Sequence, residues 1–318
     1  MNILSLLLLL MLGGGQRQML VPDSSVPLKI AASPGHFFLW SRKAIFELKG
    51  TTFTKFAECG PGCNSVAVLG DGRLAVQDGH NVAILGPRGM RKELPKLPSG
   101  FWTRGIASDG CLIVAYGSIM GKETSGKTAA IDLLRDEYTI RGDKYFEVMP
   151  SVQVFRDNTW HSARMLPATA RGTIYELRIE NGLGIALTRG HVFRTVDAGQ
   201  DWTGIPPRRI CDGFTGGDCS WKDGDVSAGR LWLAGTDGFL AQSSDRGDTW
   251  KNKSLGKHDF CQVQGAAGFA VIGDCDGGVW KFSKALLRVP VAAGKDAREL
   301  WMSNDTLWVL TSDRKSIV

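Results

Sequence analysis

The sequence predicts an all-β fold, a seven-bladed β-propeller whose ring closes by pairing of the N- and C-terminal strands. Three observations lead to this prediction. The 318 residues include 40 glycines, which indicates many tight turns. Short apolar segments with the composition of strands recur about every 40 residues, an interval typical of propeller blades. Two of these segments end in nearly the same turn sequence.

The two similar turn sequences, called the box segments below, cover residues 190–202 and 238–250. They share the spacing Ser/Thr-x-Asp-x-Gly-x-Thr-Trp/Phe, and the second matches it in full at Ser243, Asp245, Gly247, Thr249 and Trp250. The first has aspartate in place of the second threonine and matches at Asp197, Gly199 and Trp202. In each hairpin we expect aspartate to accept hydrogen bonds from backbone N–H groups, glycine to take a positive φ, and tryptophan to pack between sheets.

Degenerate copies of the box segments extend the repeat along the chain. Their equivalent strand residues are Phe46, Ala83, Phe155, Phe193, Leu240, Trp280 and Val318. The interval between residues 83 and 155 is nearly double the others, so we place an insertion at about 117–150 in the third blade. The last copy lacks an outer strand, and residues 19–26 supply it in the predicted ring, which removes two exposed sheet edges. The alternative is a non-repeating β-sandwich with two chance box segments.

The box segments resemble those of the Asp-box (BNR) β-propellers, a superfamily that includes sialidases, sortilin-type receptors and the photosystem II assembly/stability factors. The length, the predicted export and the seven repeats most resemble the compact assembly-factor type. This resemblance implies the propeller fold and a structural role for the box residues, at hairpin turns away from the ligand face. It says little about activity, because the superfamily contains both enzymes and binding proteins.

The N-terminus predicts export. Residues 3–12 are almost entirely Leu, Ile and Met, a stretch too short to span a bilayer but typical of the apolar core of a signal peptide. Three glycines follow, so we place a signal peptide at residues 1–15 and a single propeller domain at 16–318. The mature chain is then secreted, periplasmic or lumenal and has no integral membrane span. A retained anchor or a mis-assigned start is the alternative.

The cysteines fit an oxidising compartment. Six of the seven lie in three close sequence pairs, and we expect disulfides among Cys59, Cys63, Cys211, Cys219, Cys261 and Cys275. Cys111 is expected to be a free thiol in an apolar strand. The cysteine and histidine spacings do not match a zinc site, and the acidic loop at 211–219 does not follow the EF-hand pattern. We therefore predict neither a metal nor a cofactor.

Candidate binding residues recur at equivalent positions of the repeat. Six positions before the turn that ends each inner strand, polar side chains interrupt apolar segments, and a solvated channel ring accounts for them. These residues are Lys29, Arg104, Glu176, Asp223, Gln262 and Glu299. The turns after the second strands should open at the same mouth and contribute Arg42, His80, Arg189, His191, Asp237, Asp276 and Arg314. We predict a mixed-charge channel mouth; the alternative is a water-filled funnel with ordinary turn residues.

The sequence contains no catalytic set, so we predict an exported, non-catalytic binding or assembly propeller with a protein partner. The alternative is a glycan-active propeller, either a lectin or a sialidase-like glycoside hydrolase that uses Tyr175 beside Glu176. The Arg-Ile-Pro element usual in sialidases is missing, however, and the chain has only 4 tyrosines. Nucleic acid is disfavoured because the net charge of +6 is spread without a basic run. A phosphate-loop match at 121–128 and an Arg-Gly-Asp tripeptide at 141–143 are attributed to loops of the insertion.

Overall fold

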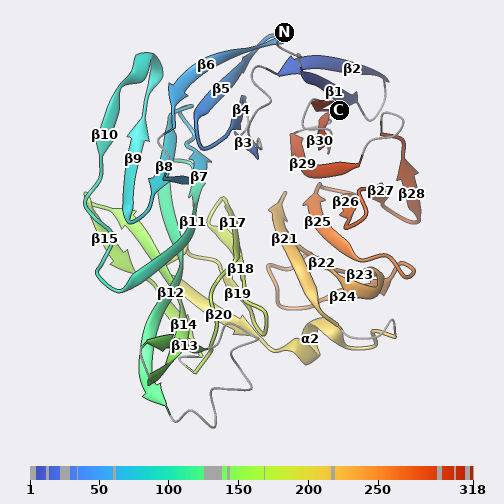
Figure 1. Cartoon of the computed structure of the whole chain (residues 1–318). Coiled ribbons are helices and arrows are strands. Elements are labelled where there is room, and N and C mark those ends of the chain that lie inside the picture. Colours follow the sequence, from blue (N-terminus) through green and yellow to red (C-terminus); the bar gives the residue numbers. More distant parts are fainter. Residues whose placement is uncertain are drawn as a thin grey trace.

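The structure is a computed structural model of the chain. It describes residues 5–11, 14–21, 29–33, 35–59, 62–124, 138–141, 144–167, 169–215, 219–291, 296–303, 306–311 and 316–317. Most of these residues are in strands, which pair mainly antiparallel and form sheets arranged around a central axis (Figure 1). The all-β propeller fold predicted from the repeat is therefore confirmed.

Six sheets, numbered here as blades 1 to 6, are each built from one continuous stretch of chain. Blade 1 contains β3 (Lys29–Ser33), β4 (His36–Trp40), β5 (Ala44–Lys49) and β6 (Thr52–Glu58). Blade 2 contains β7 (Cys63–Val68), β8 (Leu74–Asp78), β9 (Asn81–Leu85) and β10 (Arg91–Glu93), with the short helix η1 (Pro87–Gly89). Blade 3 contains β11 (Phe101–Asp109), β12 (Leu112–Thr124), β13 (Tyr138–Arg141), β14 (Lys144–Arg156) and β15 (Thr159–Ser162).

The next three blades follow the same order. Blade 4 contains β16 (Arg164–Leu166), β17 (Glu176–Glu180), β18 (Leu183–Leu187), β19 (Val192–Thr195) and β20 (Asp201–Ile205), followed by the helix α2 (Pro207–Cys211). Blade 5 contains β21 (Trp221–Ser227), β22 (Arg230–Gly235), η3 (Thr236–Gly238), β23 (Phe239–Ser243) and β24 (Lys251–Ser254). Blade 6 contains β25 (Phe260–Gly265), β26 (Ala270–Asp274), β27 (Val279–Phe282) and β28 (Leu286–Val289).

The remaining sheet, called the shared sheet, combines both ends of the chain. Its strands are β29 (Ala297–Ser303), β30 (Thr306–Thr311), β31 (Ser316–Ile317), β1 (Ser5–Met11) and β2 (Gly14–Val21). β2 pairs with β31 through Met19 and Ile317, so an N-terminal strand does join the C-terminal sheet. The segment predicted as the signal peptide includes β1, which pairs with β2, β30 and β31.

The core lies between neighbouring sheets. The inner strands of neighbouring blades contact one another from β3 through β7, β11, β17, β21 and β25 to β29, and β29 contacts β3. A separate apolar cluster fills each space between adjacent sheets. The cluster between blade 1 and the shared sheet includes Phe37, which stacks on Trp308 at a centroid distance of 4.3 Å. Burial of these apolar faces therefore holds each sheet against both of its neighbours.

The two box segments have the hydrogen bonds expected of them. Asp197 Oδ1 accepts the backbone N–H groups of residues 200 and 201, and Asp245 Oδ1 accepts that of Thr249 at 2.9 Å. Gly199 and Gly247 have φ values of +85° and +92°, which side-chain-bearing residues rarely adopt. Trp202 is fully buried among residues of blades 3 and 4, as predicted for a tryptophan between sheets.

The insertion extends blade 3 as a long hairpin. β12 and β14 pair from Ile113 with Phe155 out to Thr124 with Tyr145, and β13 adds to the β14 edge. Residues 121–124 of the phosphate-loop match therefore belong to a strand, while 125–128 lie outside the described residues. The extended first half of this motif does not form the loop that phosphate binding requires.

The cysteines pair within the three close sequence pairs: Cys59 with Cys63, Cys211 with Cys219, and Cys261 with Cys275. Cys111 is a free thiol, as expected, but its predicted place in an apolar strand is wrong. It is exposed in the turn that connects β11 to β12, and the apolar strand begins one residue later. Two-residue turns leave no apolar signal of their own, so the strand boundary was not visible in the sequence.

One reactive thiol is therefore expected in the native protein. Iodoacetamide should add a single group without denaturant, because Cys111 is exposed and the other six cysteines are oxidised. Intact mass before and after labelling measures this, and Cys111→Ser should abolish the addition. Labelling that persists in Cys111→Ser would contradict the assignment.

Candidate functional site

The predicted ring residues lie on or at the ends of the innermost strands, but several join blades instead of facing water. Asp223 and Asp225 on β21 are only 8% and 7% exposed. Their Oδ2 atoms accept hydrogen bonds from the N–H groups of Val263 and Gly265 on β25, at 2.8 and 2.7 Å. The sequence interpretation of a wholly solvated ring is therefore wrong at Asp223. A buried carboxyl group is retained there because the next inner strand offers it a backbone donor.

Glu299 makes the same kind of contact across the two ends of the ring. Its Oε2 accepts the backbone N–H of Ile30 on β3 at 2.8 Å, which connects the shared sheet to blade 1. Glu180 on β17 similarly accepts the N–H of Ala228 at 3.0 Å. Acidic side chains thus link successive blades at several points around the channel.

The channel contains a cavity of about 560 Å³ whose lining includes the acidic residues Glu176, Asp225 and Glu299. Burial, followed by the charge of the nearby Glu176, raises the pKa of Asp223 to about 8. Burial also raises the pKa of Glu299 to about 7 and that of Asp225 to about 6. Glu176 pairs with Arg178 at 3.0 Å and is the main cause of the raised pKa of that guanidinium. Neutral carboxyl groups therefore limit the negative charge of the channel near neutral pH.

A second cavity of about 730 Å³ lies where the inner strands begin, and is called the mouth pocket below. Arg104 near the start of β11 and Arg189 in the turn between β18 and β19 both line it, so two residues predicted from different blades converge. Lys222 adds a third cation. Among the described residues that line this pocket there is no carboxylate. The pocket therefore favours an anionic ligand group.

Aromatic side chains form the walls of the mouth pocket. Trp102 is 38% exposed there, and Tyr175 and Trp221 complete the aromatic lining. Tyr175 donates its hydroxyl hydrogen to the carbonyl of Trp221 at 3.3 Å, while the Trp221 indole donates to the carbonyl of Thr188 at 2.9 Å. These bonds fix two large rings in place, and ordered aromatic and arginine side chains are common at the centre of protein interfaces.

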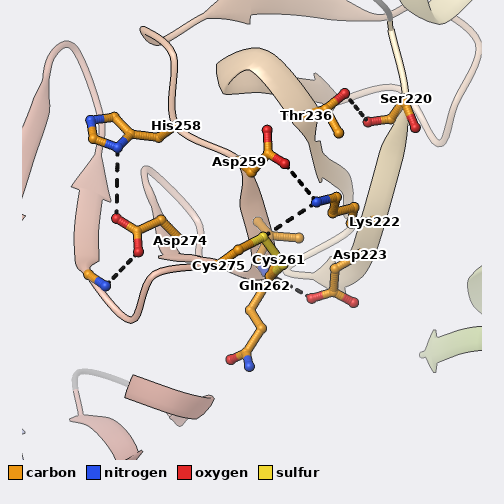
Figure 2. Close-up of a disulfide and its surroundings, with 12 residues drawn as sticks. Ser220, Lys222, Asp223, Thr236, His258, Asp259, Cys261, Gln262, Asp274 and Cys275 are labelled. Carbon is orange, nitrogen blue, oxygen red and sulfur yellow. Dashed lines mark hydrogen bonds and ion pairs between the residues drawn. A yellow bond between two sulfur atoms is a disulfide. The ribbon is translucent and has the colours of Figure 1, made fainter. Parts of the chain in front are cut away.

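Lys222, which lines the mouth pocket, also contacts a disulfide in blade 6. Figure 2 shows this contact. Its Nζ lies 2.8 Å from Asp259 Oδ2 and 3.5 Å from the Sγ of Cys275. Asp259 Oδ1 in turn accepts the backbone N–H of Asp237, at 3.2 Å. Asp237 therefore belongs to this neighbouring polar cluster and does not line the mouth pocket.

The other predicted mouth residues are spread over several places. Arg42 lines a separate depression of about 490 Å³ with Lys43, Lys55 and Glu58, at the outer part of blade 1. His191 is half-buried beside Phe193. Its pKa is lowered mainly by burial and also by the positive charge of Arg171. His80 and Asp276 are exposed in turns, and Lys29 lines the channel cavity. The side-chain amide of Gln262 donates from Nε2 to the carbonyl of Arg298. Arg314 lies outside the described residues.

Sequence reasoning missed Trp102, Trp221 and Lys222 as pocket residues and did not place Arg178 in the ring. Arg178 follows Glu176 by two positions on the same strand, and side chains two positions apart point to the same face. The sequence therefore did contain the information that Arg178 accompanies Glu176. Trp102 also precedes Arg104 by two positions. Lys222 lies in the β-bulge between Trp221 and Asp223, so strand alternation does not place its side chain, and only the position of the neighbouring blade reveals its contacts.

Comparisons with known proteins show the fold. No family model matches the sequence, and the search of curated proteins found no match. Among solved structures, YCF48 bound to a D1 peptide superposes with a TM-score of 0.62 at 12% identity, over 100% of this chain and 94% of that one. Virginiamycin B lyase from Staphylococcus aureus gives 0.63 at 10% identity, over 93% and 94% of the two chains. YCF48 from Cyanidioschyzon merolae gives 0.56 at 13% identity, over 93% and 95%.

These likenesses establish a propeller. At such identities they do not transfer an activity, since the similar structures include both a lyase and a peptide-bound protein.

The glycoside hydrolase alternative finds no support. A sialidase needs a tyrosine that a neighbouring carboxylate activates as a nucleophile. In the structure, burial raises the pKa of Tyr175, and the charges of Asp223 and Glu176 raise it further. The hydroxyl is also used in its bond to the Trp221 carbonyl. Tyr175 is therefore held as a neutral phenol that shapes the pocket.

Proposed function

We propose that the protein is a binding propeller that takes an extended, acidic segment of a protein partner in the mouth pocket. The observation that carries this proposal is the convergence of Arg104, Arg189 and Lys222 with an aromatic wall and no carboxylate among the described lining residues. Arginine and exposed tryptophan supply directional and apolar contacts to a peptide, and cations select its acidic side chains. The likeness to a peptide-bound propeller agrees with this role.

The proposal includes three finer points. In the mature chain, β29, β30, β31 and the part of β2 after residue 15 act as a seventh blade that closes the ring, supported by the Glu299–Ile30 bond and the Phe37–Trp308 stack. The hairpin bonds of the box segments support membership of the Asp-box propellers. Three disulfides support export, with residues 1–15 as the signal peptide. Within the described residues, no helix has the length and apolarity needed to cross a membrane.

Peptide binding tests this function. The probe is a fluorescent decapeptide of alternating Glu and Leu, compared with the same peptide carrying Gln in place of Glu. Replacing Arg104 and Arg189 with Gln should weaken binding of the Glu peptide by roughly tenfold or more, because two charge-assisted contacts are lost. Fluorescence anisotropy at two salt concentrations measures the change and its electrostatic part.

The depression at Arg42 supplies a matched control. Arg42→Gln with Lys43→Gln removes the same charge from the other cavity and should change affinity less than twofold. Equal binding of the Glu and Gln peptides, or a larger loss in this control, would refute the proposal.

A further inference from the structure

One of the three disulfides differs from the others in exposure and charge. Cys59 and Cys63 are 5% and 1% exposed, and Cys211 and Cys219 are half-buried against the core between blades 4 and 5. Cys275, by contrast, is exposed, and its partner Cys261 is half-buried. Among the described residues, Lys222 is the cation in hydrogen-bond contact with a disulfide sulfur, at 3.5 Å from Cys275 Sγ.

We propose that Cys261–Cys275 is a thiol–disulfide exchange site for a dithiol reductant, with Lys222 stabilising the thiolate of Cys275. A nearby ammonium favours a thiolate over a thiol, and a thiolate is the better leaving group. Cys275 is exposed and Cys261 is only half-buried, so a reductant can reach the disulfide and attack Cys261. The Cys59–Cys63 disulfide is buried and lacks this exposure.

The exchange balances in two steps. A thiolate of the reductant attacks Cys261 Sγ, forms a mixed disulfide and expels Cys275 as a thiolate beside Lys222. The second thiol of the reductant then attacks its own sulfur in the mixed disulfide, which releases Cys261 and leaves the reductant as a disulfide. Two electrons pass from the dithiol to the protein; of the two thiol protons, one goes to Cys261 and one to solvent.

The surrounding structure does not depend on the disulfide alone. The backbone N–H of Cys275 donates to the Asp259 carbonyl at 2.8 Å. β25 and β26 pair on both sides of the bulge that contains Cys261. On the far side of the turn, Asp274 accepts the Gly278 N–H and the Trp280 indole. Reduction is therefore expected to leave blade 6 folded.

Reduction also bears on the mouth pocket, a consequence that rests on the proposed function. Lys222 lines that pocket, and a Cys275 thiolate would add a negative charge beside it. Binding of the Glu decapeptide should then weaken by roughly two- to fivefold, the size expected for one partly exposed charge.

The exchange site is tested without any peptide. The protein is equilibrated at pH 8 with graded ratios of reduced and oxidised dithiothreitol, alkylated, and mapped by mass spectrometry. Cys261 and Cys275 should be alkylated at ratios that leave Cys59 and Cys63 oxidised. In Lys222→Met, reduction of Cys261–Cys275 should need a ratio of reduced to oxidised dithiothreitol about three- to tenfold higher than in the wild type. In Lys222→Arg the required ratio should stay close to that of the wild type, because the positive charge is kept. Lys257→Met, in the loop before β25, is the matched control.

Near-ultraviolet circular dichroism confirms that each variant is folded before titration. Two results would overturn the exchange site. One is reduction of Cys261–Cys275 only at dithiothreitol ratios that also reduce Cys59–Cys63. The other is an equal change in the required ratio in Lys222→Met and Lys257→Met. Selective reduction with unchanged peptide binding would overturn only the coupling to the pocket. Failure of the wild-type protein to bind the peptide in either redox state would refute the proposed function and leave the exchange result standing.

Discussion

Replacing Trp202 with alanine should destabilise the protein by about 3–5 kcal/mol, the usual cost of removing a fully buried large aromatic side chain. Trp202 is 0% exposed and packs in the cluster between blades 3 and 4 with Val154, Ile179 and Phe193. A cavity there cannot collapse easily, because sheets on both sides hold its walls. Its indole also donates to the Gly199 carbonyl at 3.0 Å. Chemical denaturation measures the loss as a shift in midpoint.

The second box segment supplies an internal control. Trp250 makes the equivalent bond to the Gly247 carbonyl at 3.2 Å but is only half-buried. Trp250→Ala should therefore lower the free energy of unfolding by about half as much as Trp202→Ala or less, because it loses the same hydrogen bond but less buried apolar contact. Equal losses in the two variants would mean that the hairpin bond, and not packing between blades, determines the stability of the box segments.

The repeat made most of the fold predictable. The strand residues equated in the sequence, from Phe46 to Trp280, fall on β5, β9, β14, β19, β23 and β27. Val318 lies outside the described residues. A strand must bury one face against each neighbouring sheet, so its apolar spacing is visible without the structure. The turn at Cys111 was misplaced because short turns carry no such spacing.

The candidate site was only partly predictable. Arg104 was expected from its place on an inner strand and Arg189 from the turn after a second strand, and both line the mouth pocket. Lys222 was not expected, because its position depends on Asp259 and Cys275 in the next blade. Asp223 was found as a ring residue but given the wrong environment. Composition alone does not distinguish an acid that faces water from one that accepts a backbone N–H of a neighbouring strand.

The raised pKa of Asp223 predicts that the protein loses stability as the pH rises from about 6.5 to 8. The folded protein retains a proton on this carboxyl up to a pKa of about 8, whereas in the unfolded chain the group has its ordinary pKa and is already ionised. The folded state therefore binds more protons across this window. Its stability should fall by about 2 kcal/mol and level off above pH 8. Chemical denaturation at half-unit pH intervals measures the slope.

Asp223→Asn separates this proton from the rest of the site. The amide oxygen can still accept the Val263 N–H, but the side chain no longer titrates, so the slope between pH 6.5 and 8 should become much shallower. In this variant Glu299 still makes stability fall with rising pH, but less steeply, because its pKa of about 7 lies near the lower end of the range from pH 6.5 to 8. Asp276→Asn, at an exposed turn, should keep the wild-type slope. A slope that is unchanged in Asp223→Asn would mean that Asp223 is ionised in the folded protein, and that Arg178 outweighs its burial.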